Sequence, residues 1–199
     1  VVEWITRDCA EILTEDPLNG SDAGTRRDCI QAFWPNPCAH LEPIREQARI
    51  LARKVARLSD HPEYPVMGVF ENSLGGRIAV AGYAPWTYLQ SIPKNRQLKK
   101  LFRWLSKDCL SAFIGSSHKA AIWARKTVDG RAAAVILNAS HDTARQLELV
   151  LKTRAECVTL FKMNGQTQNL AATGGDGVYN HFKLPYLAPW QIVFVTANE

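Results

Sequence analysis

The 199-residue sequence predicts a β-dominated α+β chain, in which a short α/β part is followed by an antiparallel β-sandwich. Three observations predict this class. Pro and acidic residues interrupt the first forty residues, one amphipathic helix ends the first half, and after residue 108 short apolar runs alternate with tight-turn signals. We therefore expect two domains, residues 1–107 and residues 108–199.

Composition supports a soluble globular chain. Hydrophobic residues make up 46% of the sequence, and no apolar run approaches the ~18 residues of a membrane span. The five cysteines are odd in number and form no Cys-x-x-Cys pair, so neither a disulfide framework nor a zinc site is indicated. The chain begins at Val1 without a signal-peptide pattern, which leads us to expect a fragment and leaves its localisation open.

The first half contains one ambiguous segment and one clear hairpin. Residues 33–37 contain two prolines and are expected to be extended or turning. Apolar residues recur at helical spacing through residues 43–58, which favours a helix, but residues 48–58 are short enough to form a strand instead. The apolar runs 66–70 and 78–82 surround paired glycines, and we expect a β-hairpin there.

Residues 94–106 are predicted to form an amphipathic helix after Pro93. Its apolar stripe and its basic arc lie on opposite sides; the stripe comprises Leu98, Leu101, Phe102 and Leu105, and the arc comprises Arg96, Lys99, Lys100, Arg103 and Lys107. A basic helix could contact nucleic acid, but no recognition motif accompanies it. We expect a solvated basic face and no nucleic-acid partner.

The second half carries the pattern of a sandwich. Asp129-Gly130 separates the apolar runs 120–124 and 132–137, and Asn164-Gly165 follows the run 157–161; both dipeptides favour tight hairpin turns. Leucines alternate with polar residues through residues 146–152, and the β-branched run 190–196 fits a buried last strand. Trp123 and Trp190 lie in these strand patterns and are expected in the core.

These segments also resemble a known family. The runs Ala48-Arg49-Ile50-Leu51-Ala52-Arg53 and Val69-Phe70-Glu71-Asn72-Ser73-Leu74-Gly75-Gly76-Arg77-Ile78-Ala79-Val80-Ala81-Gly82-Tyr83 and the closing helix resemble the end of an amidotransferase-like, trimerisation-type domain. Such a domain follows the catalytic barrel in β-galactosidase-type glycoside hydrolases. The second half, with Gly130-Arg131, Val135-Ile136-Leu137-Asn138-Ala139-Ser140, Leu184-Pro185 and Leu187-Ala188-Pro189-Trp190, resembles their small C-terminal β-sandwich. The resemblance implies a truncated α/β part in residues 1–107 and a strand at Ala48–Arg53.

Catalytic motifs are not found in the sequence. Glycoside hydrolysis needs two carboxyl groups about 5–9.5 Å apart, and the barrel that would carry them in the resembled family is absent. Glu71, at the head of the predicted hairpin, is better explained as a solvated or turn-forming carboxylate. The histidines and cysteines show neither metal spacing nor a nucleophile motif, so we expect no catalytic residue, metal or cofactor in this chain.

Aromatic side chains are the remaining functional lead, because flat rings stack on the apolar faces of sugars. Trp34 lies in a Pro-rich segment, and three further rings cluster before the helix: Tyr83, Trp86 and Tyr88. These four residues are the candidate sugar contacts. The alternative is that the rings are buried and seal the junction between the two domains.

The sequence thus predicts a non-catalytic C-terminal accessory portion of a glycoside hydrolase, with a structural, oligomerisation or active-site framing role. The expected partners are the missing catalytic barrel, further copies of the chain and a carbohydrate, with no nucleic acid or membrane. One alternative is a carbohydrate-binding module with an aromatic platform. A second is a protein-interaction module, which would expose an apolar patch of several hundred Å².

Overall fold

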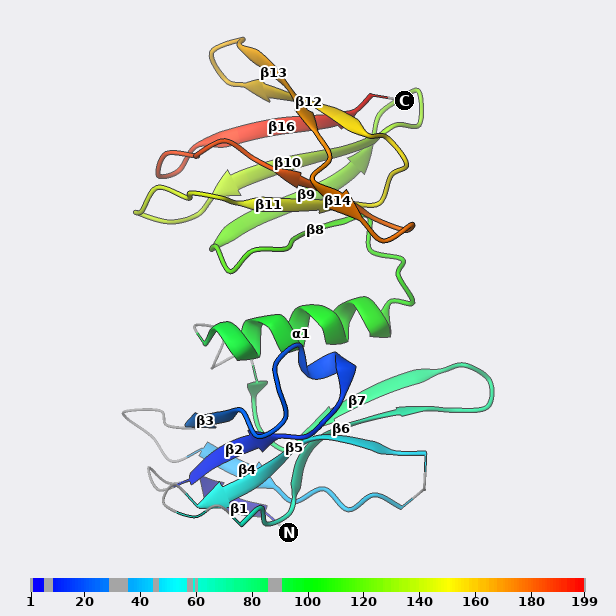
Figure 1. Cartoon of the computed structure of the whole chain (residues 1–199), viewed down its shortest axis with the longest axis vertical. Helices are drawn as coiled ribbons and strands as arrows, with labels where there is room; N and C mark the ends of the chain where they lie inside the picture. The colour runs from blue at the N-terminus through cyan, green and yellow to red at the C-terminus, as the bar shows by residue number, and fades with distance from the viewer. Residues whose placement is uncertain are drawn as a thin grey trace. The chain divides into compact units, whose positions relative to one another are not determined.

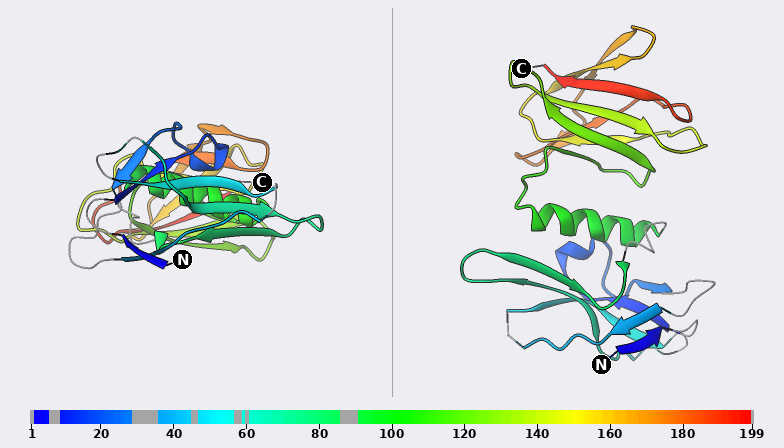
Figure 2. Two further views of the ribbon diagram at one scale, coloured as in Figure 1. Left: turned by 90° about the horizontal axis from the view of Figure 1, so that it is seen from below. Right: turned by 180° about the vertical axis from the view of Figure 1, so that it is seen from behind.

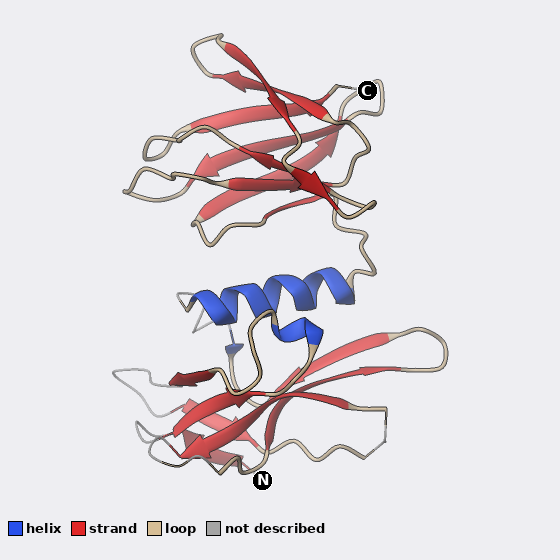
Figure 3. Ribbon diagram, in the orientation of Figure 1, coloured by secondary structure: helices blue, strands red, loops and turns tan. Residues whose placement is uncertain are grey.

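The computed structural model describes residues 2–5, 9–28, 36–44, 47–56, 59, 61–85 and 91–198. The chain divides into two compact units, Val1–Lys107 and Asp108–Glu199. All strand pairings in the described residues are antiparallel, and these residues contain one α-helix (Figures 1 and 3). The prediction of a β-dominated chain with antiparallel sheets is confirmed.

The first unit is built on a five-stranded sheet with the order β3-β2-β5-β6-β7. Its strands are β2 (Cys9–Leu13), β3 (Arg26–Asp28), β5 (Arg49–Ala56), β6 (Pro65–Glu71) and β7 (Arg77–Ala81). Two further strands, β1 (Val2–Ile5) and β4 (Asn36–Ala39), pair with each other, and a 3₁₀ turn, η1 (Pro17–Asn19), follows β2. The antiparallel pairing differs from the parallel sheet typical of an α/β fold.

Strand β5 settles the ambiguous segment. The spacing of residues 43–58 favoured a helix and left a strand open; residues Arg49–Ala56 form a strand, as the family resemblance implied. Leu51 and Val55, two of the apolar residues at helical spacing, are both fully buried in the strand. An irregular pairing with β6 between Ile50 and Arg53 breaks the simple alternation that would have identified the strand.

Helix α1 spans Ile92–Leu105, two residues earlier at its start and one earlier at its end than predicted. Leu98 and Leu101 are buried in one core with the sheet residues Leu51, Met67 and Val69. Phe102, predicted for the apolar stripe, is 59% exposed. One α-helix therefore covers the face of the sheet that carries Met67 and Val69.

The second unit consists of two antiparallel sheets around one core, as a β-sandwich requires (Figure 2). The five-stranded sheet has the order β13-β12-β16-β10-β9, with β9 (Ala120–Lys126), β10 (Ala132–Asn138), β12 (Cys157–Lys162), β13 (Thr167–Ala171) and β16 (Ile192–Ala197). The four-stranded sheet has the order β14-β15-β11-β8, with β8 (Ala112–Ile114), β11 (Glu148–Leu151), β14 (Gly174–Gly175) and β15 (Asn180–Lys183).

Both predicted hairpins of the second unit are present. Strands β9 and β10 pair around Asp129-Gly130, and strands β12 and β13 pair around Asn164-Gly165. Gly130 has a φ of 87° and Gly165 a φ of 82°, so each glycine adopts the left-handed conformation that its turn needs. In the first unit the hairpin formed by β6 and β7 is also as predicted.

The two tryptophans assigned to the core are exposed, and that prediction is wrong. Trp123 is 47% exposed because β9 alternates, and its neighbours Ile122 and Ala120 are the residues that pack on the core. Trp190 is 55% exposed and precedes β16 in a turn with a φ of 59°. Its ring meets the edge of His141 at a centroid distance of 5.5 Å.

Candidate functional site

A buried polar network lies between α1 and the sheet of the first unit. At its centre Lys94 of α1 has no exposed side-chain surface, and its ammonium lies 3.0 Å from a carboxylate oxygen of Glu11 on β2. The ammonium also donates to the Tyr83 hydroxyl, which in turn donates to the second carboxylate oxygen of Glu11. The three side chains thus form a closed ring of hydrogen bonds.

The network continues along α1 to η1. Lys94 Nζ donates to Gln97 Oε1 at 2.7 Å, and Gln97 Nε2 donates to Asn19 Oδ1 at 2.6 Å. Asn19 Nδ2 then donates to the backbone carbonyl oxygens of Thr14 and Leu51, at 2.7 Å and 2.9 Å. Residues 94 and 97 share one face of α1 because they are three residues apart.

This arrangement explains stability better than catalysis. The three donors of the Lys94 ammonium are taken up by Glu11, Tyr83 and Gln97, and both carboxylate oxygens of Glu11 are engaged. Glu11, Lys94, Gln97 and Asn19 are all 0–1% exposed. A buried polar cluster with its partners in place fixes the position of the helix on the sheet.

Of the four predicted sugar contacts, Tyr83 is the one that lies within the described residues. Tyr83 is 6% exposed, packs in the core of the first unit and uses its hydroxyl in the network, so its ring offers no face to a ligand. The physical reason is that an aromatic ring with a polar tip fills a core gap and satisfies two buried charges there. Trp34, Trp86 and Tyr88 lie outside the described residues, and the platform that they would form stays a prediction.

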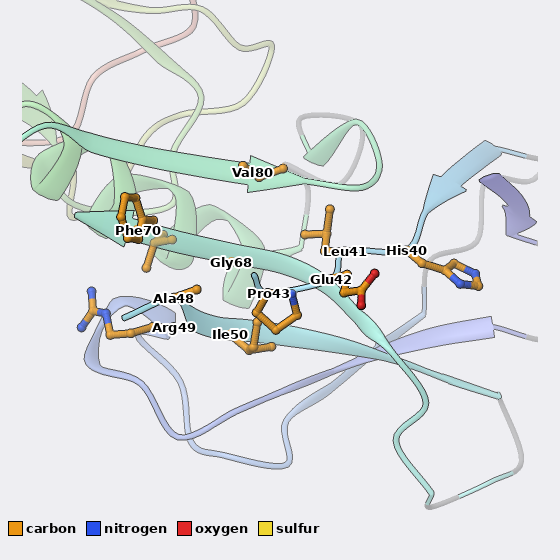
Figure 4. Close-up of a pocket in the computed structure, with 11 residues that line it drawn as sticks. His40, Leu41, Glu42, Pro43, Ala48, Arg49, Ile50, Gly68, Phe70 and Val80 are labelled. Atoms are coloured by element: carbon orange, nitrogen blue, oxygen red, sulfur yellow. The ribbon is translucent and has the colours of Figure 1, made fainter. Parts of the chain in front are cut away.

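An apolar groove of about 220 Å³ lies on the sheet of the first unit (Figure 4). Ile50, Gly68 and Val80 are cross-strand neighbours on β5, β6 and β7, and the extended segment with Leu41 and Pro43 lines the same groove. The titratable residues along it are His40, Glu42 and Arg49. With one carboxylate in its described lining, the groove lacks the pair that glycoside hydrolysis uses.

Carboxylates outside the groove also pair with cations. Glu71 lies 3.1 Å from Arg77 across the β6–β7 hairpin, which agrees with its interpretation as a structural residue. In the second unit Glu148 lies 3.1 Å from His181 Nδ1. Glu71 thus contacts a guanidinium and Glu148 an imidazole, and neither contact is with a second carboxyl group.

A serine and two histidines gather near Glu148 on β11. Ser116 Oγ lies 2.9 Å from His118 Nδ1 and accepts a 3.2 Å hydrogen bond from the backbone N–H of Glu148. A nucleophilic serine needs a base that is itself oriented by a third group. Here the carboxylate contacts His181, whereas Ser116 contacts His118, so the two pairs do not form one relay.

Among residues 9–28, 36–44, 47–56, 61–85 and 91–198, no three His, Cys, Asp or Glu side chains come close enough together to hold a metal ion. In the same part of the chain no helix has the length and hydropathy needed to cross a membrane.

Sequence reasoning missed the network and the outward placement of Trp123. Lys94 and Gln97 lie on the side of α1 that also carries Leu98 and Leu101, but a polar residue beside an apolar stripe usually lies at its solvated border. For Trp123, strict alternation against Ile122 and Ala124 is the signal that could have separated the two faces of the strand.

Comparison with known proteins finds a similar fold in a solved structure. No protein-family model matches the chain, and no curated protein matches it. Among solved structures it is similar to α-L-fucosidase isoenzyme 2 from Paenibacillus thiaminolyticus, with a TM-score of 0.53 and 14% identity. The match covers 98% of this chain and 32% of the fucosidase, so the chain spans about a third of that protein's length. At this identity the similarity shows a shared fold and no more.

Proposed function

We propose that this chain is a non-catalytic accessory portion of a glycoside hydrolase. The observation that carries the proposal is the fold similarity, which extends over 98% of the chain and therefore over both units, yet accounts for 32% of the length of the fucosidase. A catalytic part of such an enzyme would lie elsewhere in the larger protein. The expected partner is a barrel domain that carries the two catalytic carboxyl groups.

The ionisable groups of the described residues support a structural role. Glu11, Glu71 and Glu148 each contact a cation or an imidazole, at 3.0–3.1 Å, in place of a second carboxyl group. A glycosidase needs one carboxylic acid and one carboxylate on either side of the scissile bond. These three residues are better suited to holding strands and α1 in place than to proton transfer.

The proposal is tested by measuring hydrolysis of nitrophenyl α-L-fucoside, β-D-galactoside, β-D-glucoside and β-D-xyloside by the purified chain. We expect rates equal to those of buffer alone for all four substrates. Hydrolysis that falls when Glu71 or Glu148 is replaced by Gln would contradict the proposal, because it would place a catalytic carboxyl group in this chain. The Glu15→Gln variant serves as a matched control, since Glu15 is an exposed carboxylate outside the described groove lining.

A second measurement tests whether the chain belongs to a larger protein with glycosidase activity. An antibody raised against this chain should precipitate glycosidase activity from cells that produce the protein, and the activity should belong to a polypeptide or complex larger than 22.2 kDa. Recovery of the 22.2 kDa chain alone, without glycosidase activity, would contradict an accessory role in such an enzyme.

A further inference from the structure

Aromatic and aliphatic side chains form a straight row across the outer face of the five-stranded sheet of the second unit. Antiparallel pairing places Trp123 of β9 beside Val135 of β10, Val135 beside Phe194 of β16, and Phe194 beside Phe161 of β12. We call these four residues the outer row. The row crosses three strand spacings, a length of about 14 Å. The right-hand view of Figure 2 shows the strands that carry it.

The outer row is exposed although it is apolar. Trp123 is 47%, Phe194 43% and Phe161 39% exposed, and Val135 is half-buried. The sequence neighbours Ile136, Val193, Val195 and Leu160 point the other way and are fully buried in the core. The three rings of the outer row lie outside the described core cluster of the unit.

Different residues flank the row on its two sides. On one side the same register aligns Ala121, Leu137 and Ile192, with Met163 beyond the end of β12. On the other side it aligns Arg125, Ala133, Thr196, Thr159 and, on β13, Asn169. The outer face therefore changes from apolar to polar across the aromatic row.

Hydrogen bonds organise the polar side of the face. The Thr159 hydroxyl lies 2.9 Å from Asn169 Oδ1 and 2.9 Å from Asn198 Oδ1. The hydroxyl has one hydrogen and can donate to one of these two amides, so the other amide meets the hydroxyl oxygen with its N–H₂. Asn169 is exposed, and a side-chain amide beside a row of rings can form a hydrogen bond with a hydroxyl group of a ligand.

We propose that this face binds a neutral polysaccharide. A chain of pyranose units offers apolar C–H surfaces that stack on rings and hydroxyl groups along its edge, which matches an aromatic row bordered by threonines and an asparagine. Arg125 is the one charged residue among the aligned positions named above, so the face favours an uncharged ligand over a charged protein surface. The ligand class also agrees with the glycoside hydrolase-related fold. Binding at this face does not depend on the proposed accessory role.

The proposal is tested by affinity electrophoresis of the whole chain in native gels, run toward the cathode because the net charge is +5. The probes are xyloglucan, mixed-linkage β-glucan, galactomannan and xylan, with anionic polygalacturonate as a control for attraction by charge. Salt at about 0.15 M limits that attraction to distances near 8 Å. We expect slower migration in at least one neutral polysaccharide.

Two substitutions locate the binding face. Trp123→Ala and Phe194→Ala should each weaken binding about tenfold, because each removes buried apolar area and a stacking contact. Tyr186→Ala is the matched control, since Tyr186 is 71% exposed and lies outside the strands of the sheet. Trp123→Phe should restore part of the affinity. Circular dichroism and thermal unfolding should show that all four variants keep the fold.

Three results would overturn the proposal. The first is unchanged migration in every neutral polysaccharide, and the second is migration slowed equally for the parent chain and both alanine variants. The third is a dimer of the parent chain in sedimentation velocity that Trp123→Ala and Phe194→Ala dissociate, which would make the face an interface between copies. None of these results bears on whether the chain hydrolyses glycosides, so the two proposals are tested separately.

Discussion

Lys94 shows how one residue can organise the first unit. Its ammonium is fully buried and contacts Glu11, Tyr83 and Gln97, which come from β2, the segment after β7, and α1 itself. An ammonium in such a place is tolerated because every donor has a partner. The same interactions make the unit sensitive to the loss of any single member.

The first prediction concerns this ion pair. Lys94→Met should lower the free energy of unfolding of the first unit by about 3 kcal/mol, because it leaves the Glu11 carboxylate buried without its cation. Native-state hydrogen exchange of the β5 and β6 amides measures the change.

The double variant Glu11→Gln with Lys94→Met removes both charges and should recover at least half of the loss. Arg96→Met is the control on the same helix, since Arg96 is exposed, and should change stability by less than about 0.5 kcal/mol. Equal losses in Lys94→Met and Arg96→Met would contradict the structural role of the network.

The second prediction concerns Asp129 in the β9–β10 turn. The Thr127 hydroxyl donates to its carboxylate and, with the Arg131 guanidinium 2.7 Å away, holds the pKa of Asp129 below its ordinary value, against a smaller desolvation effect. Because the folded pKa is the lower one, the stabilisation is complete above the unfolded pKa and is lost as the pH falls through the folded pKa.

Side-chain carboxyl NMR measures this pKa directly. The folded chain should titrate at lower pH than an unstructured peptide with the same turn sequence, and Thr127→Val should move the pKa of Asp129 back toward the peptide value. An unchanged pKa in Thr127→Val would show that the hydrogen bond does not control the titration.

At the scale of elements, α1 depends on tertiary contacts. The helix carries polar and basic residues over most of its surface, and its Ser91 N-cap makes no side-chain hydrogen bond. A helix of 14 residues is marginal in isolation. Its position is therefore determined by the buried side chains that it contributes to the core of the first unit.

The third prediction compares two apolar residues of this helix. Leu98→Ala should destabilise the first unit by about 2–5 kcal/mol, because Leu98 is 6% exposed and its removal leaves a cavity. Phe102→Ala should cost less than about 1 kcal/mol, since Phe102 is 59% exposed. Urea unfolding followed by circular dichroism compares the two, and equal losses would show that α1 packs on a different face.

At the scale of the whole molecule, the core of the second unit is formed by residues of that unit. Its buried residues run from Ile114 to Ala197 and come from both sheets of that unit. Since a unit of about 90 residues can bury enough surface to fold alone, no residue of the first unit is needed for this core.

The fourth prediction follows from that closed core. A chain of residues 108–199 expressed alone should fold, with dispersed amide resonances in NMR and one cooperative thermal transition. The near-ultraviolet circular dichroism of its tryptophans should match that of the second unit in the full chain. A molten state, with native-like far-ultraviolet signal but no fixed side-chain resonances, would contradict the prediction.

The sequence alone determined the elements whose cause is local. The turns at Gly130 and Gly165 need a residue with a left-handed backbone conformation, whatever surrounds the hairpin. The hairpin of β6 and β7 and the helix α1 follow from sequence patterns within a few residues. The β-dominated class could be predicted from the spacing of these turns.

The tertiary structure decided the rest, because burial depends on what another segment places opposite a residue. Strand β5 was hard to predict because its irregular pairing with β6 breaks the alternation of buried and exposed residues. Lys94 is buried because Glu11 and Tyr83 contact it from distant parts of the chain, and the same contacts place Tyr83 in the core of the first unit. Trp123 is exposed because its neighbour Ile122 packs on the core. Which face of β9 is buried depends on the side on which the second sheet packs.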